Sequence, residues 1–275
     1  MRPRLIPAAL LTSTVLAVAP SAYAADDVKI MVLKERGVGT SAQAQPFVDK
    51  LVEIAKKKLG WASAKGSYFT ERKPAEAYIE SDKPQFGIMS LAAYLALKES
   101  RKLDTIGQVN VSRAGGQQYY LVSKSGSDAS ACTGEKLSTD HADDVKFVER
   151  VVFGGTMKLS DFKLDATKRP LQGIKAVIKG DSKCALIDDA QLAELKNVEG
   201  GKDLKQVWSS AKLPPLAVVA LPSASDKMKK DFKNSLDKLC VEDGKTVCKE
   251  IGIESMKPAS DQDYAQILAA YKKDK

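Results

Sequence analysis

The sequence contains only one histidine, His141. A single imidazole cannot build a site with several histidine ligands, which disfavours a zinc or copper centre. A catalytic base would also need a nucleophile and an orienting partner, and no G-x-S-x-G motif accompanies the histidine. We therefore expect no cofactor, no metal and no catalytic residues. His141 is instead a candidate for hydrogen bonding to a bound molecule, and the alternative is a structural role beside a helix N-terminus.

Long apolar runs are scarce, and the one that stands out lies at the start of the chain. Arg2 and Arg4 precede the apolar stretch of residues 5–19, and Ala22-Tyr23-Ala24 follows it as a typical cleavage site. This pattern predicts a secretory signal peptide over the first 24 residues, and therefore export to the periplasm. There is no cysteine at the cleavage site, so the sequence gives no sign of a lipid anchor. No later apolar run approaches the length of a membrane span.

Cysteines are few but even in number, which fits an oxidising compartment. Cys132, Cys184, Cys240 and Cys248 allow three pairings. The short separation of Cys240 and Cys248 favours a local disulfide, which would leave Cys132 to pair with Cys184. Free buried thiols are the alternative.

The chain carries a formal net charge of +8. Export argues against a nucleic-acid partner, and the lysine runs at 56–58 and 229–230 have no interleaved aromatic residues. Runs of this kind are usually solvated helix faces. A mildly positive field would still favour an anionic small ligand.

The first hundred residues after the leader alternate between strand and helix patterns. The apolar run Val28–Leu33 predicts a buried strand, and apolar residues at helical spacing follow between Pro46 and Gly60. Two further strand and helix pairs are expected, at 61–69 with 74–82 and at 85–89 with 91–100. Such alternation is typical of a doubly wound parallel sheet.

Two strand-like runs, 105–111 and 117–124, then follow each other with no helix between them. After a polar linker, a new unit alternates again, and the apolar run 213–222 leads back to closing helices at 228–239 and 261–273. The layout predicts two α/β lobes, the second inserted into the first. We assign residues 25–118 and 216–275 to lobe one and 119–215 to lobe two, with hinge crossings near 119–124 and 213–219 and a ligand cleft between the lobes.

Five stretches, in this order, resemble the phosphate/phosphite/phosphonate class of type II periplasmic binding proteins of ABC transporters. They are PFVDKLVEIAKKKLGW, FGIMSLAAYLALKE, KCALIDDAQLAEL, LPPLAVVALPSASDKMKKDFKNSL and DQDYAQIL. The resemblance covers nearly all of the chain after the leader. It implies a two-lobed periplasmic protein that captures a small-molecule ligand and delivers it to an inner-membrane ABC permease. We expect it to be a monomer.

One stretch departs from that family. Where its members carry a serine-rich turn that holds the anion, this chain reads Ser138-Thr139-Asp140-His141. An aspartate there would repel a dianion unless it shares a proton with the ligand. A zwitterion, an organic phosphoester or another polar solute is therefore considered beside phosphonate.

Candidate ligand-binding residues lie where strands end, because ligands of open α/β sheets bind outside the carboxyl ends of the strands. Arg36, Gly39, Thr40 and Ser41 form a turn before a helix, and helix N-termini attract anions. The alternative is a flexible connector.

Further candidates occupy similar places on other strands, and each has a structural alternative. Ser90 and Asp188 could cap the helices that follow them, although Asp189 could cap the helix in place of Asp188. Tyr68 could pack in the core, and of Tyr119 and its neighbour Tyr120 only one should face the cleft. The other candidates are the residues of the departing turn, namely Thr139, Asp140 and His141.

Two other functions compete with transport. The same binding fold could serve a signalling receptor as a solute sensor. It could also be an enzyme with a cleft nucleophile, which would need a free thiol at Cys132 or Cys184.

Overall fold

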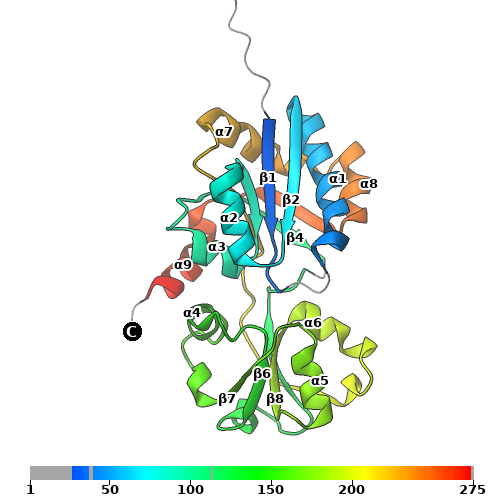
Figure 1. Cartoon of the computed structure of the whole chain (residues 1–275), viewed down its shortest axis with the longest axis vertical. Helices are drawn as coiled ribbons and strands as arrows, with labels where there is room; N and C mark the ends of the chain where they lie inside the picture. Colours follow the sequence, from blue (N-terminus) through cyan, green and yellow to red (C-terminus); the bar gives the residue numbers. More distant parts are fainter. Residues whose placement is uncertain (1–26, 37–39, 113, 274–275) are drawn as a thin grey trace, which may run out of the picture.

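The computed structural model describes residues 27–36, 40–112 and 114–273, so the predicted signal peptide lies outside the described residues. The chain folds into two α/β lobes, each built on its own β-sheet (Figure 1). The predicted architecture of two such lobes is confirmed.

The larger lobe is built on a six-stranded sheet with the order β11-β4-β10-β3-β1-β2. Its strands are β1 (Asp27–Leu33), β2 (Ser63–Phe69), β3 (Phe86–Met89), β4 (Asp104–Val111), β10 (Leu216–Ala220) and β11 (Ile253–Pro258). Strands β1 to β3 are parallel, but β10 pairs antiparallel with both β3 and β4, and β11 pairs antiparallel with β4. The parallel arrangement expected for the first three strands is confirmed, and the whole sheet is mixed because β10, which returns from the other lobe, and β11 run in the opposite direction.

Helices cover both faces of this sheet (Figure 1). Residues of α1, α7 and α8 share one apolar cluster with the strands, and residues of α2, α3 and α9 belong to a second cluster. The helices are α1 (Ser41–Leu59), α2 (Arg72–Asp82), α3 (Leu91–Leu97), α7 (Asp226–Ser235), α8 (Asp243–Glu250) and α9 (Ala265–Lys272).

Local signals fix both ends of α1. Thr40 forms a capping box with Gln43, and Gly60 ends the helix in the left-handed conformation with φ 66°. The helix also lies very close to β2, because a Cβ on Gly66 would lie 2.4 Å from Cγ1 of Val48. This close packing holds the start of α1 at the carboxyl end of the sheet.

The smaller lobe has a five-stranded sheet with the order β7-β6-β8-β5-β9. Its strands are β5 (Tyr119–Ser123), β6 (Lys136–Thr139), β7 (Lys163–Ala166), β8 (Cys184–Asp188) and β9 (Lys205–Ser209), and its helices are α4 (Val145–Phe147), α5 (Gln172–Lys179) and α6 (Asp189–Glu194). Strands β6, β7 and β8 are parallel, whereas β5 runs antiparallel to β8 and β9.

Several elements differ from the pattern in the sequence. Strands β7, β9 and β11 and helix α8 were not expected, because their short, polar sequences lack apolar periodicity. The apolar pattern of residues 142–153 predicts one helix, but the structure has α4 followed by a π-helical segment, Val148–Val152. Short 3₁₀ segments occupy Ala129–Cys132, Leu159–Asp161, Leu195–Asn197, Gly201–Asp203, Leu236–Lys238 and Asp261–Tyr264.

The chain passes between the lobes twice. Strand β4 of the larger sheet ends at Val111 and β5 of the smaller sheet begins at Tyr119, while β9 ends at Ser209 and β10 begins at Leu216. Both connections therefore lie between a strand of one sheet and a strand of the other. The smaller lobe is inserted into the larger one, and the exact lobe boundaries stay a prediction.

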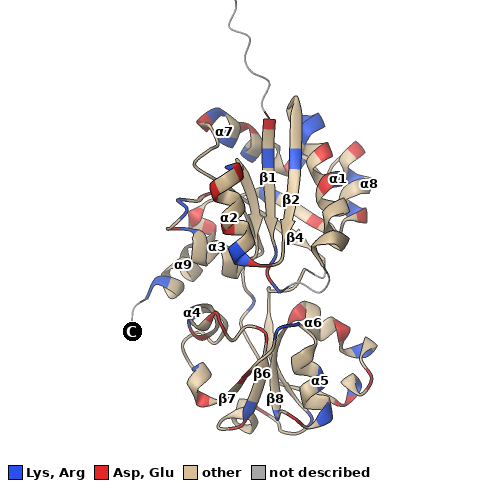
Figure 2. Ribbon diagram, in the orientation of Figure 1, with Lys and Arg blue, Asp and Glu red and all other residues tan. Residues whose placement is uncertain are grey.

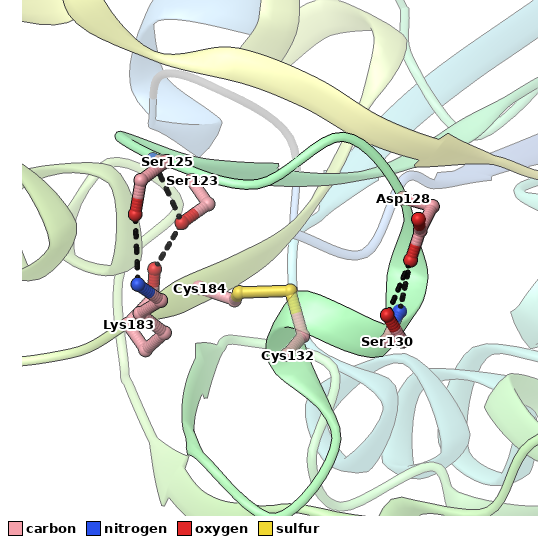
Figure 3. The surroundings of a disulfide bond; sticks show 7 residues. All are labelled: Ser123, Ser125, Asp128, Ser130, Cys132, Lys183 and Cys184. Atoms are coloured by element: carbon pink, nitrogen blue, oxygen red, sulfur yellow. Dashed lines mark hydrogen bonds between the residues drawn. A yellow bond between two sulfur atoms is a disulfide. The ribbon is translucent and has the colours of Figure 1, made fainter.

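Two disulfides use all four cysteines, Cys132 with Cys184 and Cys240 with Cys248. The pairing that the spacing favoured is confirmed. Figure 3 shows the first bridge joining the 3₁₀ segment Ala129–Cys132, within the polar linker, to the start of β8. It ties the linker to the central part of the smaller sheet, and no free thiol remains.

Charged residues of both signs are interspersed along the helices of both lobes (Figure 2). Many of them pair, as Lys57 does with Asp243. Among the described helices, none combines the length and apolar character needed to cross a bilayer.

The two disulfides should differ in their contribution to stability. In the chain-entropy model, a cross-link over 52 residues contributes about 4 kcal/mol and one over 8 residues about 2.5 kcal/mol. Urea unfolding should therefore show a larger loss for C132A/C184A than for the matched variant C240A/C248A. An equal or reversed order would show that the longer bridge does not restrict the unfolded chain.

Candidate functional site

A small cavity lies between the lobes and has walls from both. The larger lobe contributes residues 34–36 and 90–92, the connections contribute residues 115–117 and Pro214, and Tyr119 and His141 come from the smaller lobe. Its volume is ≈ 20 Å³, which leaves room for about one water molecule. The two lobes are thus closed upon each other in this conformation.

The strand order explains why these residues meet. Lys34 and Ser90 directly follow the parallel strands β1 and β3, and the backbone N–H of Ser90 donates to the carbonyl of Leu33 at 2.9 Å. In the smaller lobe, Tyr119 at the start of β5 is paired with Asp188 at the end of β8. The carboxyl edges of both sheets therefore face the same space, as in other open α/β sheets.

The connection between β4 and β5 approaches the site closely. Gly115 and Gly116 have φ values of 74° and 82°, a conformation that glycine adopts without strain. A Cβ on Gly115 would lie 2.3 Å from Oδ2 of Asp188. Only glycine therefore lets this connection pass between the acidic side chain and the cavity.

Two residues that line the cavity each have a buried polar atom with no hydrogen-bond partner among the described residues. The atoms are Oγ of Ser90 and Nε2 of His141, and these residues are 8% and 4% exposed. A buried polar atom without a partner is rare and costs free energy. These atoms are therefore available to a bound molecule.

His141 is held from two sides. Its backbone N–H donates to Oγ1 of Thr139 at 3.2 Å, and its ring lies edge-on to Tyr119 with centroids 5.1 Å apart. Burial lowers its pKa to about 4 from an ordinary value of 6.5, against the opposing effect of Asp140. The imidazole is therefore neutral at pH 7 and offers hydrogen bonding without charge.

Lys34 is a site residue that the sequence analysis missed. It is only 7% exposed, lines the cavity, and its ammonium donates to the carbonyl of Glu35 at 3.3 Å. A signal was present in the sequence, since Lys34 is the first polar residue after the apolar strand that begins at Val28.

Of the predicted candidates, the structure brings Arg36, Ser90, Tyr119 and His141 together around the cavity. Tyr119, not Tyr120, faces it, since the hydroxyl of Tyr120 donates to Gln118.

The acidic candidates have structural partners beside the cavity. Asp188 caps α6 through the backbone N–H of Gln191 at 2.8 Å, which was the alternative role considered for it, and burial raises its pKa to about 6. The side-chain amide of Gln191 donates to the carboxylate of Asp140 at 3.1 and 3.2 Å. Asp189 instead accepts from the backbone N–H groups of Gln117 and Gln118.

The remaining candidates do not line the cavity. Thr139 donates its hydroxyl to the carbonyl of Leu186 at 3.0 Å. Thr40 and Ser41 begin α1, and Tyr68 packs against the apolar cluster beneath that helix. Gly39 lies outside the described residues.

Ion pairs join the two lobes beside the cavity. Arg72, at the start of α2, contacts the carboxylates of Glu35 at the end of β1 and Asp144 before α4, each at 2.8 Å. Burial opposes the charge of Arg72, but hydrogen bonds with both carboxylates raise its pKa above the ordinary value. Arg36 makes a second connection, to the carbonyl of Asp140 and the carboxylate of Asp143.

The C-terminal helix makes a third contact between the lobes. The guanidinium of Arg150, in the π-helical segment, donates to the carbonyl of Tyr271 in α9 at 3.0 Å. Lys146 lies over the ring of Tyr271 with its ammonium 4.4 Å from the ring centre. Figure 1 shows α9 reaching from the larger lobe toward α4.

Comparisons with known proteins agree with this fold. The model of the family described as ABC transporter, phosphonate, periplasmic substrate-binding protein matches residues 41–264. No curated protein sequence matches the chain.

Solved structures with the same fold share little sequence. A binding protein component of an ABC phosphonate transporter from Pseudomonas aeruginosa has a TM-score of 0.66 and 14% identity, over 89% of this chain and 86% of that chain. PhnD1 from Prochlorococcus marinus in complex with methylphosphonate has a TM-score of 0.67 and 10% identity, over 88% of this chain and 96% of that chain. The periplasmic aliphatic sulphonate binding protein SsuA from Escherichia coli has a TM-score of 0.60 and 11% identity, over 89% of this chain and 85% of that chain.

The fold is that of a type II periplasmic binding protein, with two lobes closed on a site at the edges of both sheets. Within that class, the chain belongs to the family of periplasmic substrate-binding proteins of phosphonate ABC transporters. The resemblance seen in the sequence is confirmed, and the protein serves as a solute-binding component of an importer.

His141 can be tested directly because it is the only histidine in the sequence. In NMR spectra its ring resonances should titrate with a pKa of about 4, whereas the urea-unfolded protein should titrate near 6.5. Between pH 6.5 and 4 the imidazole is protonated in the unfolded state but not in the folded state. The contribution of His141 to the free energy of unfolding therefore falls as the pH drops from 6.5 to 4. A folded-state pKa near 6.5 would show that the imidazole is solvated.

Arg72→Gln should favour the open form, because it leaves the carboxylates of Glu35 and Asp144 facing each other without a cation. Small-angle X-ray scattering should show a larger radius of gyration than for the parent protein. The matched control is Arg101→Gln, since Arg101 also contacts two carboxylates, Glu76 and Glu80, but within the larger lobe. If both variants scatter like the parent, Arg72 does not hold the lobes together.

Proposed function

We propose that the protein captures a small oxyanion of the phosphonate type in the cavity between its lobes and presents the closed form to an inner-membrane ABC permease. One observation supports this most strongly. Ser90 Oγ and His141 Nε2 are buried without partners on the same cavity as the ammonium of Lys34. A ligand with several oxygen acceptors would satisfy such a group of donors.

The proposal extends to the organisation of the chain. Lobe one comprises residues 25–118 and 216–275, lobe two comprises residues 119–215, and the first 24 residues direct export to the periplasm. The protein acts as a monomer. Ligand contacts with the second lobe favour closure, because a ligand shifts a conformational equilibrium only by its difference in affinity for the two states.

We propose no chemistry on the ligand. The family consists of substrate-binding proteins. Both cysteines considered as nucleophiles, Cys132 and Cys184, form a disulfide, which argues against a cysteine enzyme on this scaffold. Among the described residues, no group of histidine, cysteine and acidic side chains has the arrangement of a metal site.

The expected ligand class can be tested by thermal shift with phosphate, phosphite, methylphosphonate, methanesulfonate and a zwitterionic aminoalkylphosphonate. A ligand at about 100 times its Kd should add about 2.7 kcal/mol to the free energy of unfolding. Ser90→Ala and His141→Gln should each weaken the same ligand about tenfold, as expected for loss of one hydrogen bond in a buried site. Thr40→Ala, at the exposed start of α1, is the control that should bind normally.

A flat response to every compound in this panel would contradict the proposed ligand class. Binding that survives in both the Ser90 and His141 variants would place the ligand elsewhere on the protein.

A further inference from the structure

We propose that the site selects a singly charged tetrahedral oxyanion, and that Lys34 is the residue that balances its charge. This inference rests on the proposed function and specifies the ligand of that same site. It follows from which charged groups around the cavity already have partners and which do not.

Most charges at this cavity are already neutralised. Arg72 forms ion pairs with the carboxylates of Glu35 and Asp144, and Arg36 forms one with that of Asp143. Among the described side chains, these ion pairs leave no second cation available to a ligand at the wall formed by the end of β1.

Lys34 differs from its neighbours because it forms no ion pair with any described carboxylate. Its ammonium uses one of three donors, on the carbonyl of Glu35, although the residue is 7% exposed. Burying a charge with no carboxylate within ion-pair distance is costly. The position of the ammonium is therefore suited to a ligand anion, with Ser90 Oγ and neutral His141 as uncharged hydrogen-bonding groups beside it.

Two carboxylates from the smaller lobe limit how much negative charge the site accepts. Asp188 lies behind Gly115, and its charge interacts with that of Lys34. Asp140 precedes His141, and its carboxylate has two uncharged side-chain neighbours, the amide of Gln191 and the neutral imidazole of His141, whose Nε2 lies 3.6 Å from Oδ1. A second negative charge on the ligand would face these carboxylates without another cation to offset it.

Two classes of ligand are singly charged tetrahedral oxyanions: a sulfonate, and a phosphonate that retains one proton. Calorimetric titration with methanesulfonate and methylphosphonate between pH 7 and 9 distinguishes them. The charge of methanesulfonate is constant in this range, whereas methylphosphonate loses its second proton. The affinity ratio of the two ligands therefore isolates the charge of the ligand, because protonation of protein groups affects both titrations alike.

We expect the affinity for methylphosphonate, relative to methanesulfonate, to fall about tenfold per pH unit above the second pKa of the phosphonate. Binding of methanesulfonate alone would support the proposal and identify the sulfonate as the source. A ratio that rises with pH would overturn it, since the site would then prefer the dianion.

Failure of both ligands would also overturn the inference. If another compound of the thermal-shift panel still binds through Ser90 and His141, the proposed function stands without it. If no compound binds, both proposals fail.

Lys34→Gln tests the role of the cation itself. It should weaken the bound oxyanion about 10- to 100-fold, which corresponds to the loss of a hydrogen bond to a charged group. Its melting temperature without ligand should equal or exceed that of the parent protein, because a buried charge is removed. Lys34→Arg should restore part of the affinity.

The matched control is Lys65→Gln, which removes the same charge from an exposed position of β2 in the same sheet. It should bind like the parent protein. Equal weakening by Lys34→Gln and Lys65→Gln would show that only the overall positive field matters, and the assignment of Lys34 would be wrong.

Discussion

The contact of Arg72 with Glu35 and Asp144 is the interaction on which the closed conformation most depends. It joins the end of β1 and the start of α2 to the loop before α4 in the other lobe. Both carboxylates are largely buried, so neither can lose its cation without a substantial cost. By holding the two sheet edges together, this pair brings Lys34 and Ser90 opposite His141.

Closure by such pairs has a consequence for ligand entry. The cavity is small and has walls from both lobes, so separation of the lobes would widen the path by which a ligand enters. The pairs at Arg72 and Arg36 and the contact of α9 with Arg150 all oppose this separation. The affinity for a ligand then depends on how far its contacts in the closed form outweigh any change in the contacts between the lobes.

The sequence predicted much of the architecture but less of the site. Strands with continuous apolar runs, such as Val28–Leu33, were assigned correctly because burial on both faces leaves a strong pattern. The short strand Lys163–Ala166 was missed because it lies at a sheet edge and is mostly exposed. At the site, Ser90 and His141 were predicted, but Lys34 was overlooked because lysine on a helix or strand surface is usually solvated.

Local chemistry in the sequence determined where the elements with strong apolar patterns lie, which cysteines pair, and which family the chain belongs to. These properties depend on near neighbours or on the order of patterns along the chain. The capping of a helix by Asp188 is likewise local, because its partner Gln191 lies three residues further along the chain. Only the tertiary structure decided that Tyr119 and not Tyr120 faces the cavity, and that Lys34 forms no ion pair with a described carboxylate. Those outcomes depend on which side chains from distant segments arrive at one place, and no local pattern in the sequence contains that information.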